Sequence, residues 1–409
     1  MKKRNLYRPA IMLAACILLA GMTSCSKKED TPTVQAESSK DKSSADKTLN
    51  EAKKESEEEL DYANMSAEDL VKDFIDKKEL SDEDWLWLVS TYRYVPINDK
   101  LELEGNITSK AFSILDEKNI SYGSSKEGIK KLVKSEYPQL RGKGYEFMGT
   151  LFGLSYEELS LAKEGIKTEK DPFVLKYLIA AVGNNGTDPE VGAFLLDMAK
   201  HENAGVRAAA ATWIGTSSNK GMEGAVETLI ELMKDKDLEV AGSACGSCGA
   251  LHDDSFVEPI KEILNDDTKY ELHEDCIYSL AEMWLDYPVH QYTSEPAYRA
   301  TLEYFKKTPR TDDVPYWGTI TDISHIAESN FEAWKNKASY YNAEEIVAVM
   351  KEILQDPKVN WIGRSGAIDV ILAHGGKEAF ESLEPIINGL SDEDARFVQE
   401  SYQRKKLDN

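Results

Sequence analysis

The sequence predicts an all-α protein built from repeated pairs of helices. From about residue 66 onward the hydrophobic residues recur with the period of a helix, and no convincing stretch alternates with the period of a strand. Glycine, Asp-Pro and Asn-Asp turns separate the helical segments. These segments also resemble one another at a nearly constant spacing, which indicates a repeat protein.

The composition limits the kinds of protein that this chain can be. With 49 Lys and Arg against 73 Asp and Glu, its formal net charge is −24 and its pI is about 4.8. Such a chain lacks the basic face that neutralises phosphates, so nucleic acid is not an expected partner. A hydrophobic content of 41% supplies a sizeable core, and five cysteines in 409 residues exclude a scaffold stapled by disulfides.

The first 24 residues are typical of a signal peptide. Four basic residues precede ten consecutive apolar residues, Ile11 to Ala20, a run too short to span about 30 Å of hydrocarbon. Gly21 to Cys25, followed at once by a polar segment, resembles the lipobox of bacterial lipoproteins. The alternative is an ordinary secretory signal that happens to contain a cysteine.

The lipobox resemblance implies that residues 1–24 are removed and that Cys25 is lipidated. Two or more acyl chains give stable anchoring, since each buried CH₂ contributes about 0.8 kcal/mol. Because an acidic chain is repelled by anionic headgroups, we expect the protein to meet its membrane only through the lipid. The expected location is the bacterial cell envelope, with the inner, outer or surface leaflet left open.

Residues 25–60 are predicted to form a disordered tether. They are rich in Ser, Lys, Glu and Asp and contain almost no large apolar side chain. Such a segment cannot bury enough surface to offset the entropy of ordering it. The lipid would therefore be joined to the folded body by a flexible linker.

Residues 61–136 are predicted to form a helical N-terminal cap. They contain helical segments without clean repeat spacing, and a solenoid needs a polar end. The expected helices are 67–76, 83–91, 109–117 and 128–135.

The repeats are clearest in the centre of the chain. Val206–Gly215 aligns without gaps onto Val240–Gly249, and each segment is followed by a second amphipathic helix. Glycines fall at intervals of 30, 32 and 34 residues, at Gly153, Gly183, Gly215 and Gly249. We expect Gly215 and Gly249 to end their helices in the left-handed conformation.

These segments resemble the HEAT-repeat family in its short bacterial form. There an Asp-x-x-Val-Arg-x-x-Ala-x-x-x-Leu-Gly helix pairs with an Ala-Val-x-x-Leu-x-x-Leu-Leu helix. The resemblance covers residues 137–285 and 343–390, about half of the chain. It implies a right-handed α-solenoid of HEAT-like helical hairpins over residues 137–409, with the second helices lining the concave face.

Two surfaces are candidates for binding a partner. Glu227, Glu231, Glu258 and Glu262 fall at outward positions of second helices and could attract a basic protein segment. The alternative is a polar face that is merely solvated. Residues 286–342 are irregular and rich in aromatic residues, which often supply the anchors of an interface. Tyr287, Tyr292 and Trp317 are the candidates there, and the alternative is that these rings pack in the core.

Three cysteines and a histidine form the sharpest chemical pattern. Cys245 and Cys248 in a C-x-x-C arrangement, with His273 and Cys276 further on, are similar to a zinc site or a redox pair. However, the repeat alignment places Cys245 and Cys248 at core-facing positions, where a free cysteine packs as a small hydrophobe. Packing is the main expectation, and an inter-repeat disulfide between Cys245 and Cys276 or bound metal are the alternatives.

No catalytic motif accompanies these patterns. A phosphate-binding glycine loop, a Gly-x-Ser-x-Gly elbow and a His-Glu-x-x-His helix are all absent from the sequence. Paired acids such as Asp253-Asp254 and Asp266-Asp267 fall at turns, where Asp caps the next helix. We therefore expect a protein-binding scaffold without enzymatic activity or cofactor. The alternatives are a metal-dependent or redox module and an envelope polysaccharide-binding protein.

Overall fold

The structure is a computed structural model whose described helices lie between Tyr62 and Asp408. Within the part of the chain that it describes, every regular element is helical apart from two isolated β-bridges. The predicted all-α fold is therefore confirmed. The signal peptide, Cys25 and nearly all of the tether lie outside the described residues. The structure describes residues 60–123, 126–151, 154, 156–285, 292–307, 318, 320, 323 and 338–408.

The described residues of the N-terminal cap contain four α-helices close to those expected. They are α3 (Ala67–Val71), α4 (Asp82–Ser90), α5 (Ile107–Glu117) and α6 (Lys126–Leu132). Ser66 and Ser81 each accept a hydrogen bond from a backbone N–H in the first turn, and the acid at that position reaches back to the serine. These reciprocal caps fix where α3 and α4 begin.

The cap also contains a short hairpin, residues 95–104, that a purely helical reading of this region missed. A bridge joins Ile97 to Leu103, and the Asn98 side chain accepts hydrogen bonds from the N–H groups of Lys100 and Glu102. Leu101 at the turn lies against Gly205 at the start of α11. The hairpin therefore packs the cap directly onto the repeats.

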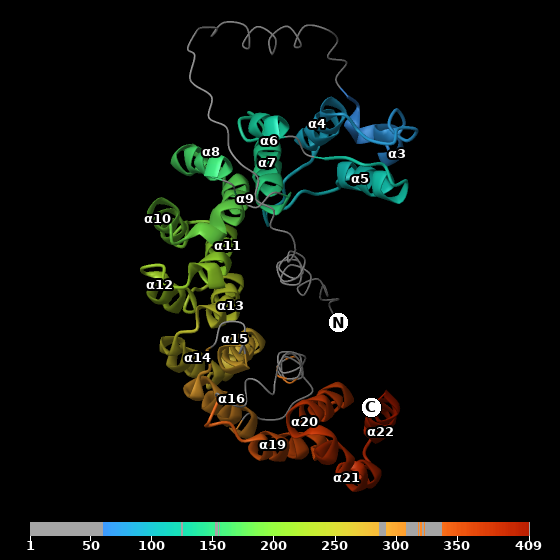
Figure 1. Cartoon of the computed structure of the whole chain (residues 1–409), viewed down its shortest axis with the longest axis vertical. Helices are drawn as coiled ribbons and strands as arrows, with labels where there is room; N and C mark the ends of the chain where they lie inside the picture. Colours follow the sequence, from blue (N-terminus) through green and yellow to red (C-terminus); the bar gives the residue numbers. More distant parts are fainter. Residues whose placement is uncertain are drawn as a thin grey trace, which may run out of the picture. The chain divides into compact units, whose positions relative to one another are not determined.

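The body consists of paired helices in two layers (Figure 1). The first helices of the pairs contact one another in sequence order and form one layer. They are α7 (Pro138–Leu151), α9 (Pro172–Val182), α11 (Ala204–Ile214), α13 (Leu238–Ser247) and α15 (His273–Leu285). The second helices form the other layer. They are α8 (Tyr156–Thr168), α10 (Pro189–Met198), α12 (Ala225–Leu232) and α14 (Val257–Leu264).

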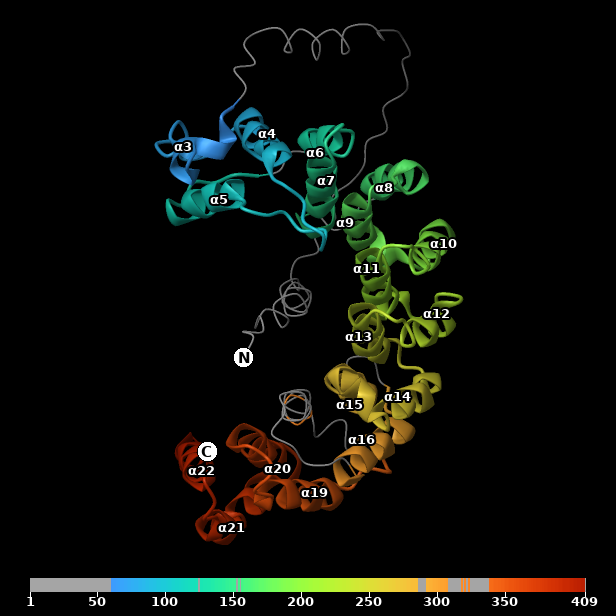
Figure 2. The ribbon, with the colours of Figure 1, turned by 180° about the vertical axis from the view of Figure 1, so that it is seen from behind.

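The layer of first helices is curved, and the second helices lie on its convex side, as both views show (Figures 1 and 2). The expectation that they line the concave face was therefore wrong. The reason is that the first helices are the ones with small side chains, such as Ala208 and Ala211 on α11. Small residues let neighbouring helices approach closely, so the layer that carries them is the more tightly packed one.

The chain continues through a second set of paired helices. They are α16 (Glu295–Lys307), α19 (Ala343–Gln355), α20 (Trp361–Glu381), α21 (Glu384–Gly389) and α22 (Ala395–Asp408). Helix α20 contacts both α19 and α22, in the manner of the central pairs. In the described residues, no helix combines the length and the apolar character that crossing a membrane requires.

The repeated glycines have a different role from the one expected. Gly183, Gly215 and Gly249 all lack the positive φ of a left-handed cap. Instead they lie where neighbouring first helices touch. A Cβ on Gly183 would lie 2.4 Å from the Trp213 ring, and one on Gly249 would lie 2.6 Å from a backbone oxygen. Close packing, and not turn geometry, therefore requires these glycines. Gly153 lies outside the described residues.

Candidate binding surface

The four candidate glutamates lie on two consecutive second helices. Glu227 and Glu231 are one turn apart on α12, and Glu258 and Glu262 are one turn apart on α14. All four are exposed. Residues four apart share one face of a helix, so each pair projects from one side. We name these four residues the acidic ridge.

The acidic ridge is poorly neutralised. Glu258 pairs with Lys261 at 3.0 Å, but the Glu258 side chain is 77% exposed, so water screens the pair and it contributes little. Among the described residues, no ion pair joins Glu227, Glu231 or Glu262 to a basic side chain. The ridge therefore presents net negative charge on the outer layer.

The aromatic candidates are less favourable as a surface. Tyr287 and Trp317 lie outside the described residues. Tyr292 is half-buried, its ring stacks on His252 at 4.9 Å, and its hydroxyl donates to Asp254 at 2.8 Å. Burial and the Asp254 carboxylate both raise the pKa of Tyr292 above its usual value. The Tyr292 side chain therefore connects the segment before α16 to the segment between α13 and α14.

Other aromatic residues of this region pack inside the protein. Trp284 on α15 and Tyr298 on α16 are buried, with ring centroids 5.2 Å apart. Tyr341 contacts both rings, and its hydroxyl lies 2.9 Å from Nδ1 of the buried His374 on α20. These rings form the core that joins the central pairs to the C-terminal pairs.

The three cysteines lie between α13 and α15 as fully buried free thiols. The thiol of Cys248 contacts the carbonyl of Cys245 at 3.3 Å, and Cys276 lies beside Cys245. Burial raises the pKa of the Cys248 and Cys276 thiols, which disfavours the reactive thiolate. Cys245 and Cys248 thus occupy the core positions that the repeat alignment predicts.

His273 is engaged elsewhere. Its Nε2 lies 3.2 Å from the carbonyl oxygen of Ile263, and its Nδ1 lies 3.3 Å from the hydroxyl of Tyr304. A carbonyl only accepts, so Nε2 carries the proton and Nδ1 accepts from the tyrosine in the neutral ring. Burial lowers the pKa of His273, in keeping with a neutral imidazole. In the described part of the chain, no three His, Cys, Asp or Glu side chains are grouped to hold a metal.

We expect the three buried thiols to be unreactive toward Ellman's reagent in the native protein and to react fully in guanidinium chloride. The measurement uses a soluble form that begins at Ser26 and therefore retains only these cysteines. Reaction of one thiol after unfolding would instead reveal a disulfide. Stoichiometric zinc in the purified protein would favour the metal alternative.

A cavity of about 110 Å³ lies between α14 and α16. The charged residues Lys261, Asp267, Glu303 and Lys307 line it, together with His273. Glu303 pairs with Lys307 and lies 3.8 Å from Lys261, so the charges around the cavity are largely balanced internally. The cavity therefore shows no strong preference for an anion or a cation.

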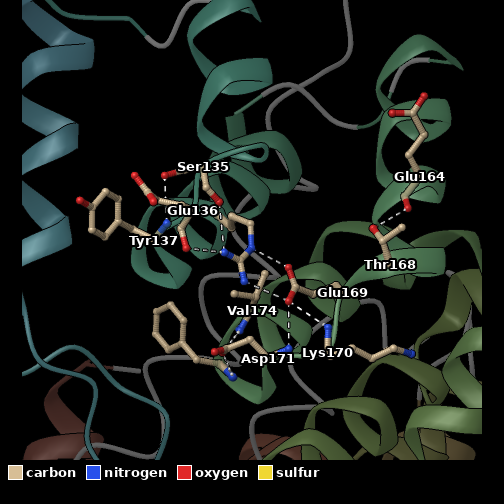
Figure 3. Close-up of polar contacts among 11 residues, drawn as sticks. Ser135, Glu136, Tyr137, Glu164, Thr168, Glu169, Lys170, Asp171 and Val174 are labelled. Atoms are coloured by element: carbon tan, nitrogen blue, oxygen red, sulfur yellow. Dashed lines mark hydrogen bonds and ion pairs between the residues drawn. The ribbon is translucent and has the colours of Figure 1, made fainter. Parts of the chain in front are cut away.

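An unexpected polar contact links successive pairs of helices. The Arg141 guanidinium binds both carboxylate oxygens of Glu169, at 2.8 and 3.2 Å, and donates to the carbonyls of Ser135 and Glu136 (Figure 3). Glu169 also accepts from the N–H groups of Lys170 and Asp171. Burial acts to raise the pKa of Glu169, but these hydrogen bonds outweigh it and lower the pKa.

The same contact recurs twice more with identical spacing. Arg207 binds Asp235 and Arg364 binds Asp392, each acid standing 28 residues after its arginine. We name these three ion pairs the repeat staples. A search of the sequence for arginines followed by an acid at this interval would have found them. Their role is structural. Arg141 and Arg207 each connect one inter-helix loop to the next, and Arg364 connects the last turn of α19 to the loop before α22.

Residues 192–281 match the family model of HEAT repeats. This segment runs from α10 to α15 and contains the acidic ridge, the buried cysteines and the Arg207–Asp235 staple. No curated protein matches the chain. The match and the two-layered helical pairs together identify an all-α solenoid whose centre consists of HEAT-like repeats, an architecture compatible with a protein-binding scaffold.

Proposed function

We propose that this protein is an envelope lipoprotein that acts as a scaffold and binds a basic protein segment through the acidic ridge, without catalysis. The observation that carries the proposal is the position of the ridge. Its four carboxylates are exposed on consecutive second helices, and three of them lack an ion-pair partner among the described residues.

In the proposed mechanism, packed helices hold the negative charges of the acidic ridge in fixed positions. The apolar faces of α12 and α14 are buried in the continuous core, with Leu229 and Ile260 fully covered. The carboxylates are therefore held on packed helices. An array of like charges steers a basic partner toward the surface and raises its association rate, an effect that salt weakens.

The proposed anchor is a lipid on Cys25, which the lipobox-like sequence before it supports. Replacing Cys25 with Ser is expected to move the protein from the membrane fraction to the soluble fraction of the cell envelope. Metabolic labelling with a fatty acid should mark the unaltered chain and leave the variant unmarked. Equal labelling of both proteins would disprove lipidation at this residue.

Reversing the ridge should abolish capture of its partner. The test is a cross-linking pull-down from envelope extract with the protein that begins at Ser26 and with its Glu227→Lys/Glu231→Lys/Glu258→Lys/Glu262→Lys variant. A partner captured by the first bait should be absent from the second, because attraction has become repulsion. Capture by the first bait should also weaken as salt rises, since exposed charges farther apart than the Debye length, about 8 Å at physiological ionic strength, are largely screened.

A matched control separates this effect from net charge. Asp73, Asp76, Glu79 and Glu117 are exposed acids of the N-terminal cap, and their reversal to Lys changes the charge by the same amount. This control should retain the partner. Loss of the partner from both variants would show a dependence on total charge, and retention by both would disprove a role for the ridge.

A further inference from the structure

Two exposed aromatic rings meet near the C-terminal end of the solenoid. Trp361 is the first residue of α20 and is 38% exposed, and Phe397 near the start of α22 is 46% exposed. Their ring centroids lie 5.6 Å apart at an interplanar angle of 33°. The backbone N–H of Trp361 donates to the Asp394 carboxylate at 2.9 Å, which fixes the start of α20 beside α22.

Other exposed aromatic sites of the described chain have a cation of their own. Trp87 is 43% exposed and packs on Phe74, and the Lys77 ammonium lies 5.3 Å from the Phe74 ring. Tyr137 has the Arg93 guanidinium 6.0 Å from its ring. Within the described ranges, no Lys or Arg side chain lies over the rings of Trp361 or Phe397.

The charges around this pair favour a cation. Glu393 is exposed and precedes Asp394, whose carboxylate already touches the Trp361 backbone. The nearest arginine in sequence, Arg396, is paired with Glu400 at 2.7 Å. Arg364 is likewise committed to Asp392. The Asp394 carboxylate thus lies at the Trp361 backbone, with the exposed Glu393 next to it in the chain. Aromatic ring faces are themselves electron-rich and attract ammonium or guanidinium groups.

We infer that the Trp361–Phe397 pair is a docking point for an Arg or Lys side chain of the basic partner. The inference rests on the proposed function for the basic character of that partner, and it adds a second contact to the acidic ridge. The cation would lie over the exposed rings while Glu393 and Asp394 complement its charge. Aromatic anchors of this kind supply a large share of the binding energy at interfaces.

The test measures binding of a labelled short peptide of alternating Arg and Gly by fluorescence anisotropy at low salt. A peptide in which citrulline replaces each Arg keeps the shape and removes the charge. We expect the arginine peptide to bind more tightly than the citrulline peptide. Trp361→Ala/Phe397→Ala should weaken arginine-peptide binding about five- to thirtyfold, the effect of losing two exposed cation–π contacts.

Two further variants make the result specific. Trp361→Phe/Phe397→Tyr preserves both rings and should retain most of the affinity, which controls for misfolding. Trp87→Ala removes an equally exposed ring at the other end of the chain and should leave binding unchanged. Unaltered affinity of the double alanine variant, or an equal loss for the citrulline peptide, would overturn the inference.

The ridge variant keeps the two proposals apart. If ridge reversal abolishes peptide binding while the double alanine variant binds normally, the proposed function stands and the aromatic docking point is refuted. If only the alanine variant loses affinity, the docking point stands and the ridge is refuted as the peptide's contact. No binding by the unaltered protein would overturn the docking point, and the pull-down would then decide the ridge by itself.

Discussion

Replacing Asp392 with Asn is expected to lower the free energy of unfolding by about 3 kcal/mol, because it leaves a buried cation without its counter-charge. Arg364 is 0% exposed, and Asp392 contacts its two terminal nitrogens at 2.6 and 3.1 Å. The third guanidinium nitrogen donates to the carbonyl of Leu354 at 2.8 Å. Chemical denaturation followed by circular dichroism measures the change.

Two comparisons test whether the uncompensated charge is the cause. Adding Arg364→Met to Asp392→Asn removes the cation and should recover much of the lost stability, since an apolar replacement of a buried pair is often tolerated. Glu400→Gln breaks the Arg396–Glu400 pair, which is solvent-exposed, and should have no measurable effect. If Asp392→Asn is as mild as Glu400→Gln, the staple does not stabilise the fold.

The staple also predicts a dependence on pH. Hydrogen bonds from Arg364 hold the pKa of Asp392 below its ordinary value of 3.8. A carboxyl whose pKa is lower in the folded state stabilises the fold above its unfolded pKa and loses that contribution as pH falls through the folded pKa. The difference in stability between the unaltered protein and Asp392→Asn should therefore be full at neutral pH and shrink in acid below about pH 4.

Replacing Gly249 with Ala is expected to lower the free energy of unfolding by about 1–3 kcal/mol, the usual effect of overpacking a core. The new Cβ would lie 2.6 Å from the carbonyl oxygen and 2.8 Å from the Cα of Ser279 on α15. These are backbone atoms of the neighbouring first helix, so relief requires a helix to shift. Thermal and chemical denaturation measure the loss.

Gly389→Ala provides the matched control. Gly389 is the last residue of α21, and a Cβ there would meet nothing within 4 Å. Its φ is not positive, so alanine is compatible with the backbone. This substitution should leave stability unchanged or raise it slightly, because alanine is the better helix former. Equal destabilisation by both substitutions would show that the loss of glycine flexibility, and not crowding, is responsible.

Helix positions were largely predictable from the sequence. The segments expected at 109–117 and 83–91 correspond closely to α5 and α4, because their apolar residues recur with the helical period and Ser81 and Asn106 cap them. The segment expected at 67–76 is helical only as far as Val71. Periodicity locates a buried face well, but it does not show where a final turn loosens.

The candidate site was predictable only in part. Outward positions of α12 and α14 follow from helical spacing, so the exposure of the ridge could be inferred. Which layer of helices lies on the convex side could not be inferred. The helical period places a residue on one face of its helix, but it does not say which neighbouring helix covers that face. The hairpin at 95–104 was missed because its strands are short. Apolar residues such as Ile97 and Leu103 are too few to form a recognisable alternating pattern.

The all-α class, the repeat period and the burial of the cysteines could be predicted from the amino-acid sequence, since all three follow from local periodicity and internal alignment. The folded structure was needed to show that Gly215 and Gly249 serve close packing, that the second helices lie on the outside, and that arginines pair with acids 28 positions away. These properties depend on contacts between helices that are far apart in the chain. A one-dimensional pattern records which residues can make such contacts, and the packing selects the ones that form.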